Sequence, residues 1–236
     1  MNATAVVARI RDLQGEWKLV TSALDEPMLR APSTLPGWSR AHLLTHLARN
    51  ADAVINLLTW AESGVEHPMY GPGPARDDDI EAGSLRSAEA IHADVVSSGE
   101  RLVDFASTLP ERTWTAPVRA RLGQPITGAD ALTLRLAELT IHLVDLDRGH
   151  DFARATALLG PYLGDVVENM IGMYPGALPS CRLSTTDGTH TWTLGDGSGG
   201  SGGTVTGRPG DLLAWVSGRA DGSALGGSVP ELGSLV

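Results

Sequence analysis

The sequence has a single cysteine and no long apolar run, and each shortage excludes a class of protein. Because Cys181 is the only cysteine among 236 residues, no disulfide can form within the chain, which is typical of a reducing compartment. Nowhere do about eighteen consecutive apolar residues occur, and the first residues mix charged and apolar side chains, so we expect neither a membrane-spanning helix nor a signal peptide. We therefore expect a cytoplasmic protein with no membrane partner.

Basic residues are also scarce. The chain has 18 Lys and Arg against 28 Asp and Glu, which gives a formal net charge of −10, and the basic residues form no cluster along the sequence. Because nucleic-acid binding requires a basic surface that neutralises phosphates, we expect no nucleic-acid partner. Apolar residues make up 42% of the chain, which indicates a folded protein of one large or two moderate domains.

Several catalytic motifs are missing as well. The sequence has no Gly-x-Ser-x-Gly and no His-Glu-x-x-His motif, so neither serine hydrolysis nor the common zinc-protease layout is supported. The glycine-rich run over residues 195–203 lacks the Gly-Lys-Ser/Thr end of a phosphate-binding loop. We interpret this run as a hairpin loop.

Hydrophobic periodicity predicts a helical N-terminal part. Ile10, Leu13, Trp17, Val20 and Leu24 recur at helical spacing, which predicts the first helix. In all, the pattern predicts four long helices and a bundle, with a long loop over residues 62–83. The helices are expected over residues 3–24, 40–61 (capped by Ser39), 84–108 (opened by Ser84) and 127–148.

The pattern changes towards the C-terminus. One further helix, three strand-like pieces and a short final helix are expected over residues 155–173, 181–186, 190–194, 204–206 and 209–217. The sequence therefore predicts an α+β protein, with a helical bundle over residues 1–154 and a small α/β domain over residues 155–236.

The helix expected over residues 127–148 carries a line of polar side chains on one face: Arg135, Glu138, His142 and Asp145. Their spacings of 3, 4 and 3 residues stack them along the helix. Apolar residues flank this line on both sides, so the polar groups need partners, because burying them unpaired costs several kcal/mol.

A bound metal ion is one partner that would satisfy the polar side chains of this helix face. Glu138 and His142 are four residues apart and project the same way, and the second helix offers His42 and His46 at the same spacing. Two His and one Glu would leave the fourth position of a tetrahedral zinc open, as in catalytic sites. A salt bridge or a buried hydrogen-bond network explains the same spacing without metal.

The assembled motifs resemble the mycothiol-dependent maleylpyruvate isomerases of the DinB-like superfamily. The resemblance rests on Leu35–His46 (LPGWSRAHLLTH), Asn56–Trp60 (NLLTW) leading to Pro68–Tyr70 (PMY), and Glu138–Leu146 (ELTIHLVDL). It implies a DinB-like four-helix metal domain followed by a small α/β domain.

The resemblance also implies the site residues. Zinc would be held by His46, Glu138 and His142, and His42 would have a supporting or packing role. Asp145 is placed to orient a ligand imidazole. The segment Trp215–Gly222 (WVSGRADG) resembles the one that carries an essential arginine in the family, which would be Arg219 here.

The function implied is the zinc- and mycothiol-dependent isomerisation of maleylpyruvate to fumarylpyruvate in aromatic (gentisate) catabolism. The thiolate would add to the cis double bond, the adduct would rotate, and elimination would leave the trans isomer. Arg219 would receive a carboxylate of the dicarboxylate substrate, with Arg49 and Arg135 as weaker candidates. Two alternatives stay open, namely a mycothiol S-transferase acting on another electrophile and a noncatalytic metal-binding module.

Overall fold

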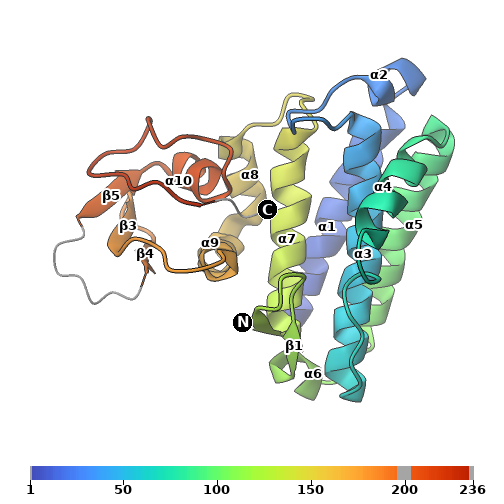
Figure 1. The fold of residues 1–236 in the computed structure, drawn as a ribbon, viewed down its shortest axis with the longest axis horizontal. Helices are drawn as coiled ribbons and strands as arrows, with labels where there is room; N and C mark the ends of the chain where they lie inside the picture. The colour runs from blue at the N-terminus through green and yellow to red at the C-terminus, as the bar shows by residue number, and fades with distance from the viewer. Residues whose placement is uncertain (1, 196–202, 234–236) are drawn as a thin grey trace. The chain divides into compact units, whose positions relative to one another are not determined.

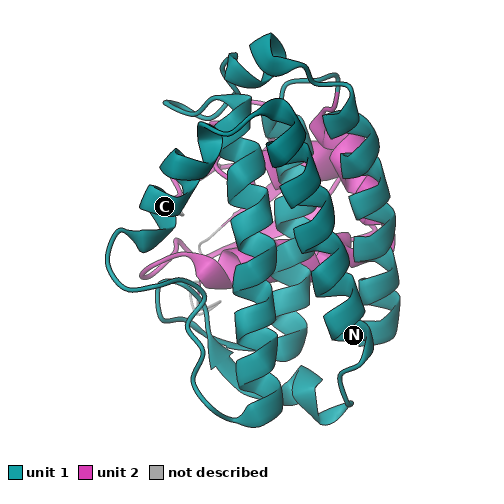
Figure 2. Ribbon diagram, turned by 90° about the vertical axis from the view of Figure 1, so that its right-hand side faces the viewer, with its two compact units in different colours: residues 1–149 teal, residues 150–236 magenta. Residues whose placement is uncertain are grey.

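The computed structural model describes residues 2–195 and 203–233 of the chain. These fall into two compact units, residues 1–149 and residues 150–236 (Figure 2). The first unit is mainly helical and the second combines helices with a small sheet, so the α+β fold class is confirmed. The domain boundary after residue 154 stays a prediction. Residues 196–202 of the glycine-rich run lie outside the described residues, so the hairpin interpretation stays a prediction too.

Four long helices make up the body of the first unit, as the periodicity predicts (Figure 1). They are α1 (Ala3–Ser22), α3 (Arg40–Ser63), α5 (Ala88–Ser107) and α7 (Gly128–Asp145). Helices α1 and α3 each contact both α5 and α7, which closes the bundle. Shorter elements connect these helices: α2 (Glu26–Arg30), α4 (Ala75–Ser84), α6 (Arg112–Thr115), and the strands β1 (Pro117–Arg119) and β2 (Pro125–Thr127).

Side-chain caps fix where the two site-bearing helices begin. Ser39 precedes α3, and its hydroxyl accepts a hydrogen bond from the backbone N–H of His42, so the predicted cap is confirmed. Thr127 precedes α7, and Thr127 and Asp130 cap each other's backbone N–H groups. Each cap sets the register of the polar side chains that follow on its helix.

Trp17 joins α1 to α7 at the centre of the bundle. Its side chain is fully buried, and its indole Nε1–H donates to the carbonyl of Leu139 at 2.9 Å. The apolar ring and its one polar atom are therefore both satisfied inside the core.

We expect Trp17→Ala to lower the free energy of unfolding by about 3–5 kcal/mol, because it leaves a large cavity and removes the buried hydrogen bond to the Leu139 carbonyl. Leu19→Ala, at a position on the same helix that is 70% exposed, should change it by less than about 0.5 kcal/mol. Chemical denaturation of the two variants and the parent measures both values. Equal effects would show that Trp17 does not anchor the core.

The segment predicted as a loop over residues 62–83 contains a helix, so that prediction is wrong in part. Helix α4 occupies Ala75–Ser84, with Asp77 and Asp78 in its first turn, where the helix dipole favours acidic side chains. The next helix begins at Ala88 after the cap Ser87, and not at Ser84. The strands β1 and β2, which pair antiparallel, were not predicted.

The second unit contains a three-stranded sheet in the order β4-β3-β5. Strand β3 (Cys181–Thr185) pairs antiparallel with β4 (Thr191–Leu194) and parallel with β5 (Thr204–Gly207), and α10 (Pro209–Val216) follows.

The helix expected over residues 155–173 is instead two helices, α8 (Phe152–Leu159) and α9 (Leu163–Met173). The break falls at Gly160 and Pro161. Gly160 has a positive φ of 56°, and Pro161 has no N–H to continue the helix.

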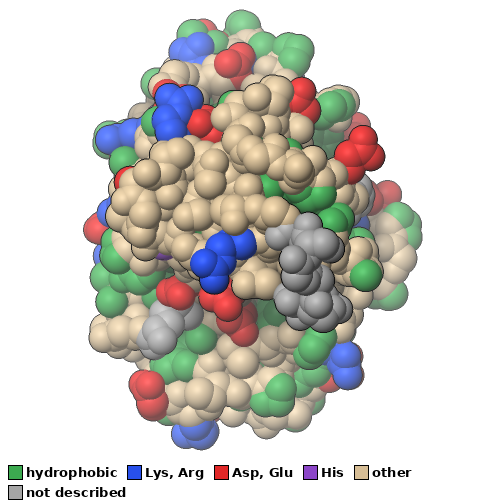
Figure 3. All heavy atoms as spheres, turned by 90° about the vertical axis from the view of Figure 1, so that its left-hand side faces the viewer, with side chains coloured by type: hydrophobic (Ala, Val, Ile, Leu, Met, Phe, Trp, Pro, Cys, Tyr) green, Lys and Arg blue, Asp and Glu red, His purple; other side chains and the backbone are tan. Residues whose placement is uncertain are grey.

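Charged side chains of both signs are present on the face of the molecule drawn in Figure 3. On the face drawn in Figure 3, the Lys and Arg side chains of the described residues lie scattered among Asp and Glu. No helix among the described residues is both long and apolar enough to cross a membrane.

Candidate metal centre

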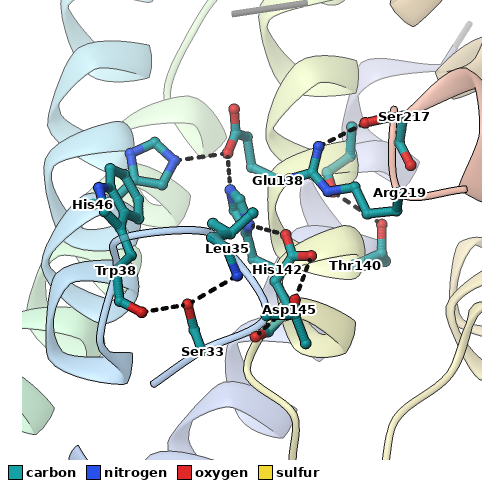
Figure 4. Close-up of polar contacts among 12 residues, drawn as sticks. Ser33, Leu35, Trp38, His46, Glu138, Thr140, His142, Asp145, Ser217 and Arg219 are labelled. Atoms are coloured by element: carbon teal, nitrogen blue, oxygen red, sulfur yellow. Dashed lines mark hydrogen bonds and ion pairs between the residues drawn. The ribbon is translucent and has the colours of Figure 1, made fainter. Parts of the chain in front are cut away.

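The three side chains predicted as ligands meet between α3 and α7 (Figure 4). Nε2 of His46 lies 3.0 Å from Oε2 of Glu138, and Nε2 of His142 lies 2.8 Å from the same oxygen. The possible ligand atoms of all three residues lie within 4.8 Å of one another. Two imidazole nitrogens therefore converge on one carboxylate oxygen.

Burial of this cluster is uneven. The side chains of His46 and His142 are 6% and 9% exposed, whereas that of Glu138 is 30% exposed. Both histidines are thus held in the bundle wall, and the carboxylate faces the more open side. Of the three side chains, Glu138 is therefore the most accessible to a ligand.

The pKa values of all three side chains are shifted from their ordinary values. Burial lowers the pKa of His46 and outweighs its attraction to Glu138. Burial also lowers the pKa of His142, but hydrogen bonds to Asp145 and Glu138 outweigh it and leave that pKa raised. Burial by itself would raise the pKa of Glu138, yet the two histidines hold it well below its usual range. These shifts favour the ionised form of Glu138, the neutral form of His46 and the protonated form of His142.

The arrangement fits a zinc ion by its donor chemistry and spacing. Ligand atoms about 2.0–2.1 Å from a tetrahedral ion lie about 3.3 Å apart, and the two His–Glu distances here are 2.8 and 3.0 Å. A His, His, Glu set is also a donor set of catalytic zinc, with one position left open. Small shifts of the side chains would admit the ion.

Asp145 fixes the orientation of His142. Nδ1 of His142 donates to Oδ2 of Asp145 at 2.8 Å, and the Asp145 side chain is 1% exposed. The hydroxyl of Thr34 donates to Oδ1 of Asp145 at 3.2 Å. A carboxylate behind a metal-binding imidazole selects the tautomer whose Nε2 is free to bind.

Trp38 and Arg76 contact the His46 ring, whose Nε2 faces Glu138. The ring centroids of Trp38 and His46 lie 5.5 Å apart, and the hydroxyl of Ser33 donates to the Trp38 carbonyl, which holds the loop (Figure 4). Nη2 of Arg76 lies 3.4 Å from Nδ1 of His46. The position of Arg76 in the sequence does not indicate this contact, because only the packing of α4 brings Arg76 to the cluster.

The other residues predicted for the site are not part of the His46, Glu138 and His142 cluster. His42 contacts Ser39 through Nδ1, and its Nε2 lies 3.1 Å from Glu81, which fits a supporting rather than a ligand role. The three arginines predicted as candidates to bind the substrate carboxylate are Arg49, Arg135 and Arg219.

Each of these arginines is engaged by protein groups. Arg49 pairs with Asp94, and the fully buried Arg135 donates to Asn50 and to the Leu47 carbonyl. Arg219 belongs to the second unit, where its Nη1 donates to the carbonyl of Ser217. The contacts of Arg49 and Arg135 argue against a role in binding substrate, and the role of Arg219 stays a prediction.

Comparison with known proteins identifies the family. The family model described as "Mycothiol maleylpyruvate isomerase N-terminal domain" matches residues 10–147, which span the bundle and all three candidate ligands. The chain belongs to this family. The resemblance seen in its sequence motifs is thereby confirmed.

Solved structures agree with this family. Two crystal structures of a mycothiol-dependent maleylpyruvate isomerase, one of them a histidine-to-alanine mutant, match with a TM-score of 0.81 and 24% identity. Each match covers 99% of this chain and 97% of the other. At this identity the likeness establishes a shared fold over both units. No curated protein gives a significant match.

Proposed function

We propose that this protein is a zinc- and mycothiol-dependent isomerase that converts maleylpyruvate to fumarylpyruvate in the cytoplasm. The observation that carries the proposal is the convergence of His46, Glu138 and His142, partly open on the Glu138 side, in a chain of the mycothiol maleylpyruvate isomerase family. The partners proposed are a dicarboxylate substrate and a low-molecular-weight thiol.

The candidate ligands would set the charge at the reaction centre. Zinc held there would lower the pKa of a bound thiol, so that thiolate is present at neutral pH. Glu138 contributes the one negative charge of the ligand set. The zinc ion together with its three ligands would therefore keep a net positive charge, which would attract the thiolate. Asp145 holds the His142 ring in place during turnover.

The reaction needs no net oxidation or reduction. The thiolate sulfur forms a bond to one carbon of the cis double bond, and the π electrons move onto the conjugated carbonyl as an enolate. Rotation then occurs about the carbon–carbon bond that was the cis double bond and is now a single bond. When the enolate collapses, the C–S bond breaks, the trans double bond forms and the thiolate is regenerated. Arg219 is proposed to bind a substrate carboxylate through its guanidinium fork.

The deciding experiment measures zinc content and maleylpyruvate conversion with and without mycothiol. One zinc per chain with strictly thiol-dependent conversion supports the isomerase. Zinc without conversion favours an S-transferase acting on another electrophile, a possibility because a fold and a metal site do not fix the substrate. If chelation unfolds the bundle and no conversion is seen, the metal is structural.

We also expect zinc binding to the metal-free protein to release protons near neutral pH. The raised pKa of His142 keeps a larger share of its imidazole protonated than in a free histidine, and a metal ligand must be neutral. Up to about one proton should leave per zinc, falling as pH rises through the pKa of His142. Titration calorimetry in two buffers of different ionisation enthalpy measures this number. Asp145→Asn, which removes the partner that raises the pKa, should release fewer protons, and buffer-independent heats would contradict the assignment.

A further inference from the structure

A cavity of about 380 Å³ lies in the first unit, next to the metal cluster. Three segments form its wall: the end of α3, the chain from residue 66 to 76, and the turn between β1 and β2. The side chains that matter for its chemistry are Trp60, Glu66, Tyr70, Arg76, Arg119 and Arg121. A volume of this size is within the usual range for small-molecule sites, about 300–1,000 Å³.

The charge of this wall is opposite to that of the protein. Three guanidinium groups line the cavity with one carboxylate, Glu66, in a chain whose formal net charge is −10. Arg76 pairs with Asp77 at 2.6 Å. Arg119 donates to the carbonyl of Gly123 at 3.2 Å, and Arg121 has no ion-pair partner among the described residues. The two hairpin arginines therefore have donors left for a ligand.

The hairpin itself places these two arginines on the cavity side. Val118 pairs with Ile126 and is buried, so Arg119, the next residue of β1, lies on the opposite face. Arg121 follows in the turn after β1 and also lines the cavity. Gly123, with a φ of 88°, allows the tight return of the chain. The turn is closed by the Ala120 N–H, which donates to the carbonyl of Gln124.

Arg76 connects the cavity with the metal cluster. Its guanidinium lies 5.7 Å from the ring centroid of Tyr70 and 5.8 Å from that of Trp38, and its Nη2 lies 3.4 Å from Nδ1 of His46. The same side chain thus belongs to the cavity wall and contacts a candidate zinc ligand. A small molecule seated in the cavity would lie beside the cluster.

We propose that this cavity binds a carboxylate of the substrate, with Arg119 and Arg121 as residues that determine specificity for a dianion. Guanidinium groups bind carboxylates through paired charge-assisted hydrogen bonds, and the rings of Trp60 and Tyr70 offer flat walls for the carbon chain. The identity of the substrate rests on the proposed function, whereas binding of the anion can be measured without turnover.

The test uses the zinc-loaded protein without thiol, with maleate as the probe and calorimetry as the readout. The double variant Arg119→Gln with Arg121→Gln should raise the Kd for maleate at least about tenfold, through lost charge-assisted hydrogen bonds. Replacing both with Lys keeps the charge and should recover part of the affinity. The control is Arg112→Gln, which removes an arginine that is 69% exposed, pairs with Glu62 and is not part of the cavity wall; its Kd should equal that of the parent.

The proposal would be overturned by no saturable binding of maleate by the parent at millimolar concentration, by an unchanged Kd in the double Gln variant, or by an equal loss in Arg112→Gln. The neutral diamide of maleate should bind equally to the parent and the double variant, and a matching loss for the diamide would also overturn it. Arginine-dependent maleate binding without thiol-dependent conversion of maleylpyruvate would instead refute the proposed function and leave the anion site standing.

Discussion

Glu138→Gln is expected to abolish zinc binding and, with it, thiol-dependent turnover. The Oε2 atom of Glu138 lies within 3.0 Å of Nε2 of both His46 and His142, so this carboxylate is the only anionic donor of the cluster. Gln has nearly the same shape but no charge. Zinc affinity should fall by more than about 100-fold, the upper range for loss of a mere supporting group, and metal analysis of the purified variant measures this.

The chain offers a matched control for this substitution. Glu81 also contacts a histidine, with Oε2 at 3.1 Å from Nε2 of His42, but its side chain is 69% exposed. Glu81→Gln should therefore retain zinc and turnover. If Glu138→Gln keeps its zinc and its activity while remaining folded by circular dichroism, Glu138 is not a zinc ligand and the metal is held by other groups.

The candidate site could be predicted from sequence because its signal is local. Glu138 and His142 are four residues apart on one helix, and apolar neighbours on both sides indicate that this polar face is buried. The sequence alone does not indicate which histidine of the second helix is the partner, since His42 and His46 are four residues apart and lie on the same face. The structure distinguishes them through packing: only His46 reaches Glu138, and His42 is taken up by Ser39 and Glu81.

The cavity wall could not be predicted in the same way, because it depends on short elements. Strands β1 and β2 have three residues each, too few for an alternating pattern to be recognised. The acidic run at residues 77–79 indicated a loop, although acidic residues also favour the first turn of a helix, as in α4. The break at Gly160 and Pro161, in contrast, had a visible signal, since proline rarely continues a helix.

Arg219→Ala is expected to remove turnover while the zinc content stays at the parent level. Arg219 lies three residues after the end of α10, where Gly218 has a φ of 75° and the backbone N–H of Arg219 donates to the Ala214 carbonyl. This backbone cap does not depend on the side chain. Loss of a guanidinium that pairs with a substrate carboxylate costs about 2–5 kcal/mol, which is roughly 30- to several-thousand-fold in kcat/KM.

A purely structural role predicts a different result. The Arg219 side chain donates to the Ser217 carbonyl, and a cation at a helix C-terminus stabilises it by about 0.3–1 kcal/mol. If that were its whole role, Arg219→Ala would lower the melting temperature slightly and leave kcat/KM nearly unchanged, as we expect for Arg208→Ala, at a side chain that is 78% exposed and paired with Asp211. If Arg219→Ala loses both zinc and activity, the substitution acts by disturbing the fold. Lost turnover with retained zinc and a nearly unchanged melting temperature assigns Arg219 to the substrate, because only a contact made with the substrate leaves both other readouts in place.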